Sequence, residues 1–180
     1  GDPAAAYADA IAGAAGSGPV ALVHATAFSD DWQLLKFLAD LLAARGIATI
    51  PADPGAIAWR NGWAAHEGTR LGAILRFFPG DWLVRTDFAP AWFGPGETPV
   101  FNPVTSLAVQ NKRFPLFARQ AGLALPALVR FLPPVEPVTA RGLGDGRLVI
   151  KPAYGRVGEG IGLTGVTPPR QLLKIRAKAA

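Results

Sequence analysis

The chain has 180 residues, half of them apolar, which suits one ordinary domain or two small ones with a real hydrophobic core. It contains no cysteine, which excludes disulfides, cysteine–zinc sites and a thiol nucleophile, and its two histidines are too few for a histidine-rich metal site. No apolar run approaches the roughly 18 residues of a membrane-spanning helix, and no signal peptide pattern stands at the N-terminus, so we expect a cytoplasmic protein.

Charge is distributed unevenly along the chain. Residues 1–100 carry 6 basic and 10 acidic side chains, whereas residues 101–180 carry 12 basic and 3 acidic ones. A basic half indicates a polyanionic partner, either nucleic acid or the phosphates of a nucleotide. A solvated basic face without a ligand is the alternative.

The N-terminal half predicts a small α/β unit, which begins with a helix over residues 3–15. Asp2 and Pro3 suit its N-cap and first turn, and Gly16 suits its end. A buried strand over 19–26 follows.

A second helix and a second strand continue this pattern. Asp30 and Gln33 form a variant capping box, Gly46 is a natural C-terminal residue, and 47–51 reads as a strand. The helix should bury a broad apolar face, made of Trp32, Leu34, Leu35, Phe37, Leu38, Leu41 and Leu42. Strand, helix and strand in this order predict a parallel pair with a right-handed crossover.

Further elements are predicted as far as the middle of the chain. Segments 57–60 and 63–65 flank Asn61-Gly62, which predicts a hairpin with a tight turn. Another buried strand is predicted over 71–78, and the Pro-, Gly- and Trp-rich stretch 80–100 reads as irregular structure.

The C-terminal half mixes short helices and strands. Asn102-Pro103 opens a helical piece, and Asn111 can cap a helix that runs to residue 120. Extended segments are predicted at residues 129–132, 148–152 and 161–166, and a basic helix begins near Pro169.

The segment between the last two strands carries the most chemical information. Its glycines are Gly155, Gly158, Gly160 and Gly162. Glycine lets backbone N–H groups approach an anion, Lys151 at the strand end supplies a positive charge, and Arg156 can form a fork onto the same anion. The Walker pattern is absent, and the dinucleotide fingerprint fits poorly because the loop returns to a strand. A glycine-rich hairpin beside a chance lysine is the structural alternative.

A second lysine, Lys112, stands at a predicted helix start about forty residues before Lys151. With this pair of segments, the chain from Arg76 to Val166 resembles the glutathionylspermidine synthase family of ATP-grasp ligases. The matching pieces are Arg76-Phe77-Phe78-Pro79-Gly80-Asp81-Trp82-Leu83, Asn102-Pro103, Asn111-Lys112, Lys151-Pro152 and Gly155-Arg156-Val157-Gly158.

The resemblance implies a fold in two parts. Residues 1–100 would form an α/β pre-ATP-grasp, Rossmann-like subdomain, and residues 101–180 the N-terminal part of an ATP-grasp domain. The family joins a carboxylate to an amine: the carboxylate attacks the γ-phosphate of ATP to give an acyl phosphate, and the amine then displaces phosphate. We therefore expect ATP, a small peptide-like carboxylate and a polyamine-like amine as partners, and neither a membrane nor nucleic acid.

The resemblance also implies roles for individual residues. Lys112 and Lys151 would hold nucleotide phosphates, and the backbone around Gly155, Gly158 and Gly160 would form a lid over them. Arg156 would be the catalytic residue, placed over the transferred phosphoryl group. Glu159 departs from the family pattern and is expected to point outward.

The metal ligands are expected outside this chain. The family holds Mg²⁺ with carboxylates and an amide well downstream of the glycine loop, and this sequence has no Asp, Glu or Asn after Gly160. The sequence also lacks methionine altogether. We therefore expect an internal fragment or truncated reading frame that is inactive alone and exposes apolar surface in its second part.

Several other residues allow a functional or a structural interpretation. For His24 a core or strand-end position is favoured, and for Asp30 and Asp31 helix capping is favoured over metal binding. The tryptophans Trp59, Trp63, Trp82 and Trp92 are expected to pack rather than to stack on bases. Arg76 lies inside an apolar strand, so it should either have a buried acidic partner or line a cleft.

Two other functions stay open. A non-catalytic nucleotide- or nucleic-acid-binding module would use the basic half, although aromatic residues are few there. A plain Rossmann-like interaction domain without a ligand is the third hypothesis.

Overall fold

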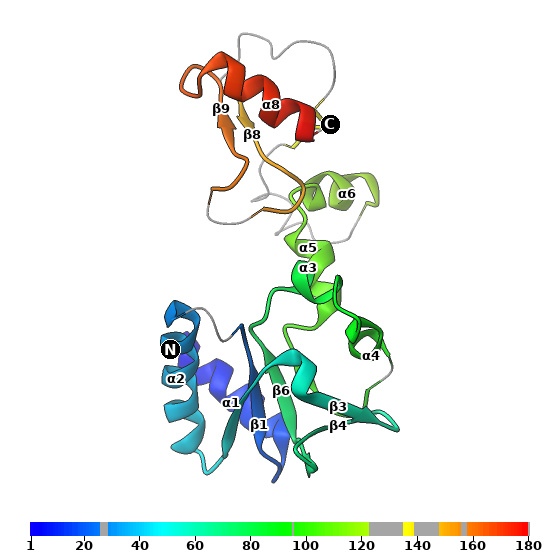
Figure 1. Ribbon diagram of the computed structural model, residues 1–180. Coiled ribbons are helices and arrows are strands. Elements are labelled where there is room, and N and C mark those ends of the chain that lie inside the picture. The colour runs from blue at the N-terminus through cyan, green and yellow to red at the C-terminus, as the bar shows by residue number, and fades with distance from the viewer. Residues whose placement is uncertain (26–28, 95, 123–134, 139–147, 156–157, 180) are drawn as a thin grey trace. The chain divides into compact units, whose positions relative to one another are not determined.

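The computed structural model describes the 180 residues apart from 26–28, 95, 123–134, 139–147, 156–157 and 180 (Figure 1). The chain divides into two compact units, Gly1–Ser106 and Leu107–Ala180, called here the first and second unit. The protein is mixed α/β, with a four-stranded parallel sheet and two small antiparallel sheets among the described residues.

The first unit is built on the parallel sheet, whose strand order is β2-β1-β6-β7. These strands are β1 Val20–Val23, β2 Thr49–Ala52, β6 Ala73–Arg76 and β7 Val100–Phe101. Val20 lies opposite Thr49 on one side and Ala73 on the other. Both β1 and β6 are buried along their full length, as expected for central strands of a parallel sheet. The predicted parallel strand pair around the second helix is confirmed.

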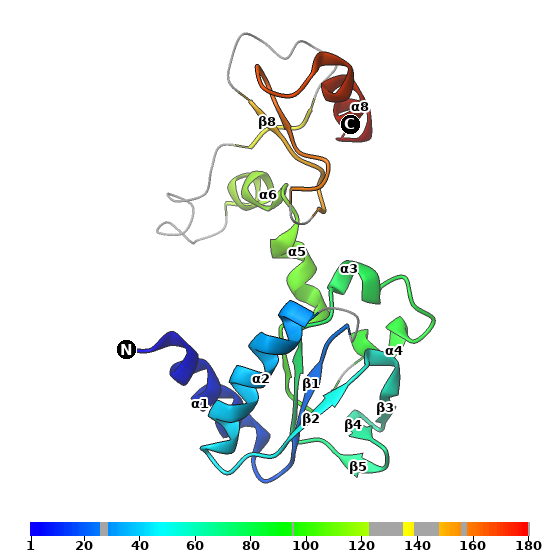
Figure 2. The same cartoon turned by 60° about the vertical axis from the view of Figure 1, so that its left-hand side comes forward.

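Helices α1 Pro3–Ala15 and α2 Ser29–Ala43 lie together on one side of this sheet (Figure 2). The main core lies between them and the sheet, and its fully buried larger members are Ile11, Val20, Leu22, Leu35, Leu42 and Leu75. The β3–β5 strands lie on the opposite side in the same view.

The start of α1 and the end of α2 are capped by the residues that the sequence predicted, Asp2 and Gly46. Ala4 N–H donates to the Asp2 carboxylate at 2.9 Å, which caps α1. At the end of α2, the N–H groups of Gly46 and Ile47 donate to the carbonyls of Ala43 and Leu42, at 2.9 and 3.0 Å. With φ of 75° at Gly46, these bonds form a Schellman motif.

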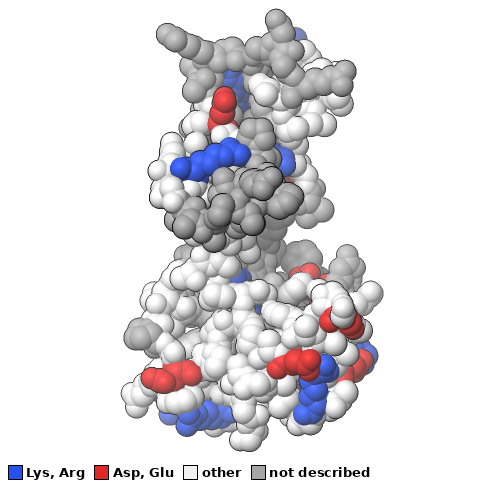
Figure 3. Space-filling model, turned by 180° about the vertical axis from the view of Figure 1, so that it is seen from behind, with Lys and Arg blue, Asp and Glu red and all other residues white. Residues whose placement is uncertain are grey.

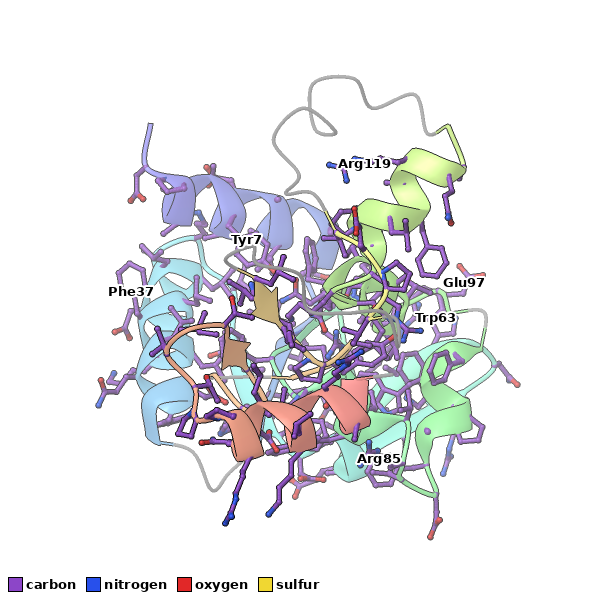
Figure 4. The ribbon with its side chains drawn as sticks, turned by 90° about the horizontal axis from the view of Figure 1, so that it is seen from above. Tyr7, Phe37, Trp63, Arg85, Glu97 and Arg119 are labelled. Carbon is purple, nitrogen blue, oxygen red and sulfur yellow. The ribbon has the colours of Figure 1, made fainter. Side chains whose placement is uncertain are left out.

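Two details of α2 differ from the prediction. The helix begins at Ser29, so Asp30 lies inside its first turn and not before it. The buried face is also narrower than expected, since it contains Leu35, Leu38 and Leu42 but not Trp32, Leu34 and Phe37, which are exposed. Figure 4 shows Phe37 on the outside of the helix. The sheet is only wide enough to cover part of the apolar face.

The predicted hairpin is confirmed and continues into a third strand. Strands β3 Ile57–Arg60, β4 Trp63–His66 and β5 Thr69–Arg70 pair antiparallel, after the short 3₁₀ helix η1 Pro54–Ala56. The two connections, Asn61-Gly62 and Glu67-Gly68, have positive φ at all four residues. Both therefore match the type I′ turns that favour tight hairpins.

The stretch predicted to be irregular contains two short helices, α3 Gly80–Leu83 and α4 Ala89–Phe93. After β7, the 3₁₀ helix η2 Val104–Ser106 confirms the helical piece predicted behind Asn102-Pro103. The rings of Trp59 and Trp92 pack edge to face with centroids 5.5 Å apart, so the packing interpretation is confirmed for these two tryptophans.

The second unit contains α5 Leu107–Gln110, α6 Phe114–Gln120, the antiparallel pair β8 Val149–Ile150 and β9 Gly162–Leu163, and α8 Pro169–Ala179. The strands predicted over 148–152 and 161–166 are therefore present but shorter, and the basic helix is confirmed. The segment 129–132 lies outside the described residues. Asn111 does not cap α6 directly, because its carboxamide oxygen accepts from Arg113 N–H at 2.9 Å, one residue before that helix begins.

Both units expose large apolar side chains on their surfaces. Acidic and basic side chains are interspersed on the face of the first unit shown in Figure 3. The second unit exposes several large apolar side chains, as predicted: Val109, Phe117, Leu148, Val149, Tyr154, Leu163, Val166 and Leu173. Within the described residues, none of the helices is both long enough and apolar enough to cross a bilayer.

Candidate functional site

The structure brings together the two segments that carry the predicted phosphate-binding residues. Lys112 lies between α5 and α6, and its backbone N–H donates to the carbonyl of Ala153 at 2.8 Å. Its ammonium Nζ lies 3.5 Å from the carbonyl oxygen of Gly155 and 3.4 Å from that of Gln110. Lys112 therefore contacts the glycine loop on both sides of Tyr154, although about forty residues separate the two segments.

The ammonium group of Lys112 is bound weakly in this arrangement. Both of its oxygen partners are neutral carbonyls near the outer limit of hydrogen-bond distance, and the side chain is exposed. A phosphate oxygen would form a shorter, charge-assisted bond with the same ammonium group. Lys112 is thus available to an anion that reaches the loop.

The glycines of the loop have a local packing role. A Cβ atom at Gly155 would lie only 2.7 Å from the ring of Pro152, and one at Gly160 would lie 3.3 Å from it. Gly158 and Gly160 also have positive φ values, of 81° and 66°, which other residues rarely adopt. The loop therefore closes around Pro152, and its glycines would be needed for that reason with or without an anion.

Lys151 follows β8 directly and is exposed. Its side chain has no hydrogen bond or ion pair with any residue that the structure describes. Side chains of a strand alternate between two faces, so Lys151 is expected on the face of Val149, opposite that of Ile150. Val149 is exposed and pairs with Leu163, whereas Ile150 is buried.

Helix α8 covers the other face of the β8–β9 pair. A Cβ atom at Gly162 would lie 2.7 Å from Leu172 and 3.4 Å from Ile175, so the absence of a side chain allows the helix to approach closely. Val149 and Leu163 on the opposite face are 54% and 39% exposed, so among the described residues this is the accessible face beside Lys151.

Two other predictions concern the loop and the metal. Arg156 lies outside the described residues, so its assignment as the catalytic residue stays a prediction. Glu159 is exposed, as expected. In the part of the chain that the structure describes, no group of three or more His, Asp or Glu residues could hold a metal ion.

Arg76 has a structural role in the first unit. Its guanidinium group is buried, with 3% of the residue exposed, and donates to the carbonyls of Asn102 at 2.6 Å, Pro103 at 3.3 Å and Phe78. It also reaches the Ser106 hydroxyl at 3.2 Å, and the Asn102 amide donates back to the Arg76 carbonyl. The group thus holds the turn after β7 against β6.

The turn held by Arg76 is also linked to α1. Tyr7 packs edge to face on Phe101, with ring centroids 6.0 Å apart. Burial raises the pKa of the Tyr7 hydroxyl, and a hydrogen bond with the Asn102 side chain opposes that rise. These contacts connect the first helix to the last strand of the sheet.

His24 is a strand-end histidine, as the sequence interpretation favoured. It is 5% exposed at the end of β1, its Nδ1 lies 3.3 Å from the Leu22 carbonyl oxygen, and its ring stacks on Trp32 at 5.4 Å. Asp31 lies in the first turn of α2 with Asp30.

Sequence reasoning missed the residues that position the loop. The carbonyls of Ala153 and Gly155 bind Lys112, and Pro152 forms the centre of the loop. No side-chain type signals a carbonyl contact, but a proline followed by four closely spaced glycines could have indicated a loop that closes around its ring.

Comparison with known proteins gives no family for this chain. No family model matches the sequence, and no curated protein matches it. The functional assignment therefore depends on the residues and geometry described above.

Proposed function

We propose that the chain binds the phosphates of ATP as part of an ATP-grasp ligase that resembles glutathionylspermidine synthase. In this proposal the first unit is a pre-ATP-grasp, Rossmann-like subdomain, and the second unit is the N-terminal part of the nucleotide-binding domain. The observation that carries the proposal is the contact of Lys112 with the glycine loop that follows Lys151.

The charge of the loop supports a phosphate ligand. Lys151 is an exposed cation at the start of the loop, Lys112 is a second exposed cation that contacts the loop at Ala153 and Gly155, and Glu159 is the one carboxylate between residues 148 and 179 of the sequence. The exposed Val149 and Leu163 beside Lys151 leave a polyphosphate room to approach, as far as the described residues show. Both lysines would hold phosphate oxygens, while the carboxylate and amine substrates would bind elsewhere in the complete ligase.

The residues fit the nucleotide phosphates but not the magnesium ion that the family uses. Phosphate binding requires cations and backbone N–H donors, the groups that two lysines and a glycine-rich loop can supply. Mg²⁺ requires oxygen ligands, and the described residues do not group enough carboxylates to hold it. No step that depends on the metal is therefore assigned to this chain.

Replacing Lys151 with alanine should weaken ATP binding by about 1.5–3 kcal/mol, the range of a hydrogen bond to a charged group. Lys112→Ala should weaken ATP binding by a similar amount, because it removes the ammonium group. The backbone N–H that binds Ala153 is retained, so the loop should keep its position. Isothermal calorimetry with ATP measures both. Lys174→Ala, which removes an exposed lysine from α8, is the matched control and should leave the affinity unchanged. Equal affinities for the Lys151 variant and the parent would show that the loop is not a phosphate site.

Arg156→Ala should lower the rate of acyl-phosphate formation by roughly 10²-fold while affecting ATP affinity much less, since the charge it would stabilise develops in the transition state. The test is single-turnover kinetics beside equilibrium ATP binding in the complete ligase. A loss confined to affinity would remove Arg156 from the catalytic role.

A non-catalytic nucleic-acid-binding module remains the competing account. It predicts that a single-stranded oligonucleotide binds more tightly than ATP and that its affinity falls steeply with salt. Binding of ATP in preference to the oligonucleotide would support the ligase proposal.

A further inference from the structure

One face of the β3–β5 sheet carries two arginines and a tryptophan. The register places Arg60 directly opposite Trp63 and Arg70 directly opposite Ala65. Side chains alternate along a strand, so Trp63 and Ala65, two positions apart on β4, share a face with both arginines. Both arginines are exposed there, whereas Ala64 is buried on the other face. Arg60, Trp63 and Arg70 thus form one group, called here the Arg–Trp cluster.

The guanidinium group of Arg70 is stacked on the indole ring within this cluster. Its central carbon lies 3.2 Å from the centroid of the Trp63 ring. Such stacking occupies the flat side of the guanidinium group and leaves the N–H groups at its edge for other partners. A guanidinium group held in this way loses less conformational freedom on binding, so its edge is preorganised to form two parallel hydrogen bonds with a carboxylate.

The two guanidinium groups have no carboxylate partner in the part of the chain that the structure describes. Glu67 lies in the turn between β4 and β5, and Glu97 N–H donates to the Gly62 carbonyl, in the turn between β3 and β4, at 2.7 Å. Even so, neither Arg60 nor Arg70 forms an ion pair or a hydrogen bond with these or other described residues. Two cations beside one indole are therefore available to an anion from outside the chain.

The charge and shape of the surroundings indicate which anion fits. Residues 1–100 carry 6 basic and 10 acidic side chains, a net charge of −4. Nucleic acids and anionic membranes are attracted by the summed positive charge of a surface, which this part of the chain lacks. A single carboxylate needs only a local pair of donors. Small ligands prefer concave sites, whereas tryptophan and arginine side chains on an open surface are typical centres of protein–protein contacts.

We propose that the Arg–Trp cluster docks an acidic segment of a partner protein. Arg70 would bind one carboxylate with two hydrogen bonds, and Arg60 would pair with a second carboxylate on the other side of Trp63. The surface belongs to the first unit and goes beyond the proposed function, since it requires no phosphate at the glycine loop.

The test uses hexaglutamate as the acidic segment and hexaglutamine as its uncharged counterpart. Titrations are followed by NMR through the indole N–H signal of Trp63, which Trp63→Phe assigns. Hexaglutamate should shift this signal, and hexaglutamine should not. Arg60→Ala and Arg70→Ala should each weaken hexaglutamate binding about 5-fold, the upper range for an exposed ion pair. Arg70→Lys keeps the charge but not the paired donors, so it should lose nearly as much.

Arg85→Ala is the matched control, because Arg85 is an exposed arginine of the first unit outside the cluster. It should leave hexaglutamate affinity unchanged, and denaturant unfolding verifies that every variant is folded. The inference is wrong if hexaglutamate does not bind, or if Arg85→Ala weakens binding as much as Arg70→Ala. Full affinity in Arg70→Lys would reduce the contact to unspecific charge attraction and overturn it too. Tighter binding of a single-stranded oligonucleotide or of anionic vesicles at Trp63 would overturn the choice of partner.

Discussion

Gly72→Ala should destabilise the first unit by about 3 kcal/mol, at the upper end of the cost of overpacking. A Cβ atom at Gly72 would lie 2.3 Å from the Ala15 carbonyl oxygen and 2.7 Å from that of Gly18. These are backbone atoms at the end of α1 and the start of β1, so they cannot rotate away as a side chain could. Denaturant unfolding followed by tryptophan fluorescence measures the loss.

Gly13→Ala provides a control with the same chemical change. Gly13 lies within α1, and a Cβ atom there would meet nothing within 4 Å. Alanine favours helix over glycine, so this variant should gain about 0.5–1 kcal/mol. Equal stabilities of the Gly72 and Gly13 variants would contradict the close approach of the two backbone segments.

Arg76→Met should cost about 3–5 kcal/mol, because it removes a buried donor group from several acceptors at once. Methionine replaces the apolar stem of arginine but carries no donor, so the change leaves Asn102, Pro103 and Ser106 without their shared partner. Arg85→Met is the control, since Arg85 is exposed and its loss should change stability by less than about 0.5 kcal/mol.

The Arg76 variant also separates a structural role from a binding role. A structural role predicts a lower unfolding free energy, with ATP affinity unchanged for the fraction that remains folded. Wild-type stability together with weaker ligand binding would instead place Arg76 in a binding site. Both quantities can be measured on the same protein, at denaturant concentrations below the unfolding transition.

The parts of the fold predicted correctly are those with local signals. The helix α1, the β1–α2–β2 sequence and the β3–β4 hairpin each depend on apolar periodicity, a capping residue or a turn pair close in the sequence. The strand β7 could not be predicted in this way. It has two residues, and it is defined by pairing with β6 about 25 positions earlier.

The candidate site was predicted in part for the same reason. Lysines and glycines are recognisable by type, and the structure brings Lys112 to the loop. The close contact between Gly155 and Pro152 depends on three-dimensional packing, so the sequence alone could not distinguish glycines that bind an anion from glycines that permit loop closure.

The two type I′ turns of the β3–β5 strands have a consequence for the order of folding. Each joins neighbouring strands through two residues, so these strands can find each other in about 1–10 μs, the usual time for a hairpin. The parallel sheet requires β1 to meet β6, which lies about fifty residues later in the chain. Closing that longer loop costs more chain entropy, so we expect the hairpin to form first and the association of β6 with β1 to limit the folding rate.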